Sequence, residues 1–203
     1  MEASIAVPKK LEGDKAQRII AAMRASVATR GAAGSTFDHV AREAGVSRGL
    51  LHYYFGSKER LLVEVVRQDC NERIRAMDER LAGAASGDEV MEALLIVLQE
   101  FLGEPRSQAV IYEMLSASRH SDEIRAELAE LYRRFREHMA TRLREKEREG
   151  VVRLQSDAEA VASILLSLGD GFGIQVITDP DWNRDLAFEL GVTLARRMLG
   201  AAD

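Results

Sequence analysis

The sequence predicts an all-α protein of about nine helices, with an N-terminal helix-turn-helix head of three helices and a larger helical body. Only three of the 203 residues are proline, the residue that helix interiors exclude. Apolar side chains recur three and four residues apart, and glycine or a capping Ser or Thr stands between the periodic segments. With 46% hydrophobic and 30% charged residues, such a chain can bury a core and remain soluble.

The first two helices of the head follow from an apolar stripe and a pair of caps. A helix is expected over residues 15–29, with its stripe formed by Ile19, Ile20, Met23 and Val27. Thr36 is placed to cap a second helix at its start, and Gly45 is placed to end it in a left-handed conformation.

Serines mark the starts of the next two helices. Ser47 caps a third helix that ends near residue 55, and Ser57 caps a long fourth helix that reaches about residue 81. Residues 44–47 form a very short, glycine-containing link between the second and third helices. Two short helices joined in this way are typical of a helix-turn-helix.

Five further helices make up the body. Two of them start with an S-x-x-E capping box, at Ser86 and at Ser156, and another starts after Ser121. We expect these helices over residues 87–103, 105–118, 121–149, 156–178 and 182–199. The predicted organisation is a flexible arm (1–12), a helix-turn-helix domain (13–60) and a body (61–203).

The charge is divided unevenly between the head and the body. Residues 1–62 contain ten Lys and Arg against six Asp and Glu, whereas residues 63–203 contain 18 against 27. A basic head on an acidic body is the asymmetry expected when only the head contacts a polyanion.

Other features narrow the class of protein. The lone Cys70 cannot form an internal disulfide, which fits the cytoplasm, and the start of the chain lacks the layout of a signal peptide. No run of about 18 apolar residues is apparent, so no membrane contact is expected. We find no nucleophile–base pair, metal-ligand cluster or phosphate loop, and we therefore expect no enzyme activity, no metal and no cofactor.

The stretch "VSRGLLHYYFGSKERLL", residues 46–62, places aromatic and basic side chains together. On a helix, Leu51 and Phe55 face the head's core, which leaves the other side chains to face outward. If this helix lies in a DNA major groove, the side chains placed to read base edges are Arg48, Gly49, Leu50, His52 and Tyr53. Tyr54 and Lys58 are then placed to reach phosphates. The alternative is that the tyrosines are ordinary half-buried helix residues.

The longer stretch "TFDHVAREAGVSRGLLHYYFGSKERLL", residues 36–62, resembles the DNA-binding head of the tetracycline-repressor (TetR) family of bacterial transcriptional regulators. The matching elements are Thr36, Val40, Ala41, the run Ala44–Ser47, Gly49, Leu51, the run Tyr53–Phe55, Lys58 and Leu61. The resemblance implies phosphate contacts by Thr36, Ser47, Tyr54 and Lys58, and groove reading by Arg48, Gly49, His52 and Tyr53. His52 stands where the family often has Tyr.

The resemblance also implies a homodimer that binds double-stranded DNA and a small-molecule effector. The interface would lie on the last two long helices, where apolar faces include Val161, Leu165, Leu186, Leu190 and Leu194. The effector pocket would be lined by Leu94, Leu98, Phe101, Tyr112, Leu115, Phe135, Met139, Leu168, Phe172 and Gln175. Asp170, inside an apolar helix, is either solvated at a dimer edge or a polar anchor for a ligand.

The function expected from these features is that of a cytoplasmic, ligand-responsive repressor, released from a palindromic operator when an effector binds the body. Two alternatives stay open. The protein could be a DNA-binding dimer that activates transcription or responds to no ligand. Much less favoured is a small-molecule enzyme that uses the body pocket.

Overall fold

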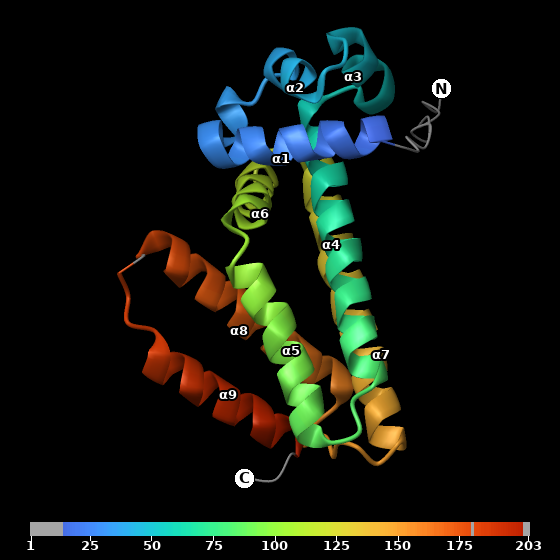
Figure 1. Cartoon of the computed structure of the whole chain (residues 1–203), viewed down its shortest axis with the longest axis vertical. Coiled ribbons are helices and arrows are strands. Elements are labelled where there is room, and N and C mark those ends of the chain that lie inside the picture. Colours follow the sequence, from blue (N-terminus) through green and yellow to red (C-terminus); the bar gives the residue numbers. More distant parts are fainter. Residues whose placement is uncertain (1–13, 180, 201–203) are drawn as a thin grey trace. The chain divides into compact units, whose positions relative to one another are not determined.

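The structure is a computed structural model that describes residues 14–179 and 181–200, and every regular element in this part of the chain is an α-helix. The predicted arm, residues 1–12, lies outside the described residues. Figure 1 shows the helices in order: α1 (Asp14–Gly34), α2 (Phe37–Ala44), α3 (Arg48–Phe55), α4 (Lys58–Ala82), α5 (Gly87–Leu102), α6 (Pro105–Ala117), α7 (Asp122–Arg148), α8 (Ala158–Thr178) and α9 (Asp185–Leu199). The predicted all-α fold of about nine helices is confirmed.

The chain forms two compact units. The first, here called the head unit, combines residues up to 68 with residues 109–128, and the second, here called the body unit, combines residues 69–108 with residues from 129 onward. Helices α4 and α7 each contribute their first part to the head unit and the remainder to the body unit.

Helix α1 contains a break that the sequence marks with a glycine. Gly31 has φ 66° and ψ 172°, values that side chains with a Cβ rarely adopt, and α1 kinks there before it ends at Gly34. The continuous helical part therefore ends close to the predicted residue 29. The space is also tight, because a Cβ on Gly31 would lie 3.3 Å from a carboxylate oxygen of Glu113.

The predicted caps of the helix-turn-helix are present. The Thr36 hydroxyl accepts a hydrogen bond from the backbone N–H of His39, and the Ser47 hydroxyl accepts one from the N–H of Leu50. Gly45 ends α2 in the left-handed conformation, at φ 67°. Helix α1 packs against α2, and α2 against α3 (Figure 1). Their shared core includes Ile19, Met23, Val27, Phe37, Val40, Leu51 and Phe55.

In the body unit, α5 packs against both α8 and α9, and α8 and α9 pack against each other. The close approach of α5 to α8 depends on Gly169, because a Cβ there would lie 3.2 Å from a Leu98 methyl group. Two predicted helix starts are wrong. Asp157, not Ser156, caps α8 through the N–H of Glu159, and α9 begins at Asp185 rather than Trp182.

Helix α8 also corrects the sequence-based statement about apolar runs. Its 21 residues are long and apolar enough, by length and composition, to cross a membrane. A core helix of a soluble protein has the same composition, and α8 has core contacts in the body unit: Ala158, Val161, Ala162, Gly169, Phe172 and Gly173 are buried. Its length and composition are therefore weak evidence of a membrane span.

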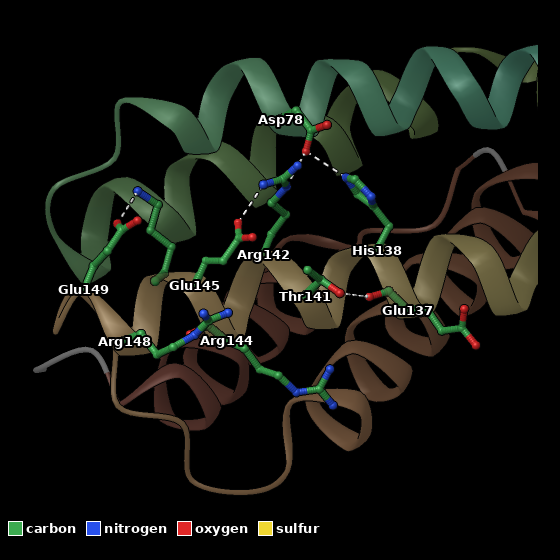
Figure 2. A network of polar contacts seen from close by, with 10 residues as sticks. Asp78, Glu137, His138, Thr141, Arg142, Arg144, Glu145, Arg148 and Glu149 are labelled. Atoms are coloured by element: carbon green, nitrogen blue, oxygen red, sulfur yellow. Dashed lines mark hydrogen bonds and ion pairs between the residues drawn. The ribbon is translucent and has the colours of Figure 1, made fainter.

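A polar network joins α4 to α7 within the body unit (Figure 2). The Asp78 carboxylate of α4 accepts a hydrogen bond from Arg142 of α7 at 2.8 Å and lies 2.7 Å from Nε2 of His138. Arg142 also donates to Glu145 at 2.6 Å. Burial alone would raise the pKa of Asp78, but His138 and Arg142 outweigh it and hold this pKa below its ordinary value.

Candidate nucleic-acid interface and effector site

Helix α3 has one buried face and one exposed face, as its sequence predicts. Leu51 and Phe55 are buried in the core of the head unit. Of the five predicted base-reading residues, four are exposed and Leu50 is half-buried. The Tyr53 side chain is prominent on this face, because 65% of its surface is exposed. The exposed residues of this face are Arg48, Gly49, His52 and Tyr53.

Arg48 at the start of α3 contacts residues on two helices. Its Nη1 atom donates to both carboxylate oxygens of Asp38 on α2, at 3.2 and 3.3 Å. Its Nε atom donates to Nε2 of His52, one turn further along α3, at 3.3 Å. Arg48 and His52 were predicted to lie on the exposed face of α3, whereas the contact with Asp38 was not predicted.

The predicted phosphate-contacting residues lie at helix ends. Thr36 and Ser47 are exposed and serve as the caps of α2 and α3, so the first N–H groups of both helices lie beside them. Tyr54 is half-buried, and its ring packs edge-on against the ring of Tyr53, with the centroids 5.0 Å apart. Lys58, also half-buried, donates from Nζ to the carbonyl oxygen of Ala32. That contact was not predicted.

The predicted pocket residues are divided between the two units. Tyr112, which is half-buried, and Leu115, which is exposed, belong to the head unit. The other eight belong to the body unit. Gln175 is exposed there and donates to the carbonyl of Gly171. The buried or half-buried residues are Leu94, Leu98, Phe101, Phe135, Met139, Leu168 and Phe172.

A polar cluster lies in the same body unit. Its members Phe101 and Asp170 were singled out from the sequence, whereas Arg73 and Gln108 were not. The guanidinium of Arg73 lies over the ring of Phe101, 4.4 Å from its centroid, and its Nη2 is buried without a hydrogen-bond partner among the described residues. Gln108 donates to the Phe101 carbonyl, while its own Oε1 is likewise buried and unpaired within the described chain. A buried donor and a buried acceptor without partners are unusual in a folded protein.

Asp170 is the acidic member of this cluster. Burial raises the pKa of its carboxyl, and a hydrogen bond from Tyr132 and the charge of Arg73 only partly counteract this. Burial lowers the pKa of the Arg73 guanidinium, and the nearby charges of Asp69 and Asp170 partly oppose this. The structure therefore places Asp170 among buried polar groups of its own unit rather than in open solvent.

The predicted dimer residues differ in exposure. Val161 is buried and Leu165 is partly buried in the core of the body unit, because this face of α8 packs within its own chain. Leu186, Leu190 and Leu194 on α9 are exposed, Leu186 by as much as 80%. Ile164, Ile174 and Ile177 on α8 are also exposed, and the sequence analysis did not name them.

Comparison with known proteins gives matches over most of the chain. Residues 19–65 match the family model of bacterial regulatory proteins of the tetR family, and residues 86–201 match that of the C-terminal part of BetI-type transcriptional repressors. The transcriptional regulator UidR of Escherichia coli (strain K12) is 23% identical over 183 residues, 90% of each chain. The regulator BetI of Rhizobium meliloti (strain 1021) is 29% identical over 150 residues, 73% of this chain and 71% of BetI.

A solved structure extends the similarity to the fold. A transcriptional regulator from Saccharomonospora viridis, determined in complex with choline, superposes with a TM-score of 0.69 and is 26% identical. The match covers 90% of this chain and 93% of that protein.

Proposed function

This chain belongs to the tetR family of bacterial regulatory proteins, and on that basis we propose that it is a repressor that leaves a palindromic operator when a small molecule binds its body unit. It is a DNA-binding transcriptional regulator, as its relatives are. The domain limits that we propose remain 13–60 for DNA binding and 61–203 for effector binding and dimerisation.

The observation that carries the proposal is the division of α3 into a buried and an exposed face. Because Leu51 and Phe55 are held in the core, the opposite face presents its side chains to a ligand outside the protein. Arg48 can donate to guanine, and the absence of a side chain at Gly49 lets the helix backbone approach the groove floor. We assign base reading to Arg48, Gly49, Leu50, His52 and Tyr53, and phosphate contacts to Thr36, Ser47, Tyr54 and Lys58.

A palindromic operator requires two copies of the head, and we propose that the body units supply the dimer. The exposed leucines of α9 and the exposed isoleucines of α8 support this, because exposed large apolar side chains are typical of association sites. Leu186, Leu190 and Leu194 would lie in the interface, while Val161 and Leu165 would support it from the core.

For the effector, we propose that the polar cluster of the body unit supplies the hydrogen-bonding groups of the site. Arg73 Nη2 and Gln108 Oε1 offer a buried donor and a buried acceptor, and Asp170 offers a carboxylate. Apolar residues of the same unit that were expected to line the pocket, such as Phe101 and Phe135, would complete it. Since the Saccharomonospora viridis protein binds choline, choline is the first compound to test. We place the protein in the cytoplasm, where such a regulator meets DNA.

Selection of bound fragments from a random duplex pool tests the proposal. The full-length protein should enrich an inverted repeat, and a metabolite screen that includes choline should contain a compound that releases it. A tight complex that no compound releases would favour the ligand-independent alternative, and reporter induction would favour an activator. Absence of any enriched sequence would refute the proposed function.

A further inference from the structure

Two side chains of the head unit hold Arg48 in one direction. Asp38, in the first turn of α2, accepts from Nη1 with both carboxylate oxygens, and His52 accepts from Nε. These contacts engage Nε and Nη1 of the planar guanidinium. Nη2, which lies beside the Nε–H, has no hydrogen-bond partner among the described residues.

His52 is itself fixed by the core. Its ring packs edge-on against the ring of Phe37, with the centroids 4.8 Å apart and the planes at 73°, and Phe37 is buried. In this contact Nε2 of His52 accepts from the Nε–H of Arg48. A chain of contacts thus runs from the buried Phe37 through His52 to the exposed Arg48.

The pair of Arg48 and Asp38 adds little to the stability of the fold. Their side chains are 60% and 57% exposed, and exposed ion pairs contribute little to folding. The pair instead restricts a long side chain that would otherwise populate many rotamers. Such restriction favours binding, because less conformational entropy is lost when the complex forms.

Asp38 also matters through its charge. It lies beside the α3 face to which we assign DNA contacts, where an unpaired carboxylate repels phosphates. Arg48 neutralises this carboxylate, so loss of Arg48 removes a donor and also leaves an uncompensated negative charge facing the DNA.

We propose that Asp38 is a specificity-determining positioning residue, which directs the free Nη2 group of Arg48 toward one base pair of the operator half-site. The inference rests on the proposed function and deepens it. Asp38 touches Arg48 through both carboxylate oxygens. Its effect on base preference must therefore pass through Arg48 and disappear when Arg48 is absent.

A double-mutant cycle in the full-length protein tests this inference. Asp38→Ala, Arg48→Ala and the double variant are compared with the wild type by affinity for a selected operator, for each of its single-base changes, and for unrelated DNA. We expect Asp38→Ala to reduce the ratio of specific to unrelated binding about tenfold. In the Arg48→Ala background, the same change should leave base preference unaltered and should strengthen binding to unrelated DNA.

Glu43→Ala is the matched control, since Glu43 is an exposed acid on the same helix. It removes the same charge and should leave the ratio unchanged. If Asp38→Ala does not fold, Asp38→Asn, which keeps the oxygen but not the charge, is expected to show a smaller loss of preference. The inference is overturned if Asp38→Ala acts like Glu43→Ala, or if it alters base preference equally without Arg48. If the wild type selects no sequence, the proposed function fails instead.

Discussion

The ammonium of Lys58 donates a hydrogen bond to the carbonyl oxygen of Ala32, with 2.8 Å between Nζ and the oxygen. Ala32 directly follows the kink of α1 at Gly31, and Lys58 is the first residue of α4. The bond therefore ties the start of α4 to the end of α1 within the head unit. A lysine expected to contact phosphate has a structural partner as well.

Lys58→Ala should consequently have two effects. Binding to every DNA sequence should weaken by a similar factor, and the slope of log Kd against log salt should fall by about one for each protomer, or about two for a dimer. The free energy of unfolding should also drop by about 1 kcal/mol, because the Ala32 carbonyl loses its donor. Filter binding and thermal melts measure these effects, with the exposed Lys15→Ala as control. A change in base preference would contradict the assigned role.

Asp78→Asn should change how the free energy of unfolding varies with pH below neutrality. The pKa of Asp78 is lower in the folded state than in the unfolded state, so its contribution is present at neutral pH. That contribution is lost as the pH falls through the ordinary range of Asp, near about 4, and below it. The variant should be less stable than wild type by about 1 kcal/mol at pH 7 and equal to it in strong acid. Urea unfolding at several pH values measures the difference, and Glu79→Gln, at an exposed neighbouring position, is the control. A difference in free energy of unfolding between wild type and Asp78→Asn that persists in strong acid would contradict this prediction.

Asp170→Asn should change the pH dependence of stability in the opposite direction to Asp78→Asn. The folded-state pKa of Asp170 is raised, so its ionised form is disfavoured and stability declines as the pH rises from about 4 through that pKa. The variant should melt at a higher temperature than wild type at pH 7, and the gap should close in acid. If Asp170 anchors the effector, release from DNA should be impaired while DNA affinity is retained. A lower melting temperature at pH 7 would show that the Tyr132 and Arg73 contacts dominate.

Substitution of two glycines with left-handed φ distinguishes the cost of backbone strain from the cost of steric overlap. Gly150 has φ 75° and open space around a Cβ, so Gly150→Ala should cost about 1 kcal/mol. Gly200 has φ 63°, and a Cβ there would overlap the carbonyl oxygen of Arg153. Gly200→Ala should therefore be clearly more destabilising in chemical unfolding. Equal costs would mean that the α9 end shifts freely away from Arg153.

Local features of the fold were predictable because they depend on neighbours in sequence. The caps Thr36 and Ser47 act on N–H groups three residues away, and the turn at Gly45 needs only its own φ. The buried positions of Leu51 and Phe55 follow from helical periodicity. The two residues at the start of α8 were harder to separate, since Ser156 and Asp157 both cap helices well, and Asp157 does so here.

Contacts between distant residues were not predictable in the same way. Nothing in the sequence indicates that Lys58 meets Ala32, or that Asp78 meets His138 sixty residues later. Asp38 lies in the first turn of α2, and its partner Arg48 belongs to the next helix. The burial of Val161 depends on which face of α8 packs within its own chain, and an apolar pattern on both faces does not specify this.

The salt dependence of operator affinity tests the central claim most directly. Because the basic head would neutralise several phosphates in each half-site, log Kd should change steeply with log salt, with a slope on the order of four for a dimer. Arg48→Ala should reduce affinity and relax base preference, whereas Lys58→Ala should reduce affinity without changing base preference. A slope near zero for the wild-type protein on its selected DNA would contradict the account of α3 as a groove-reading helix.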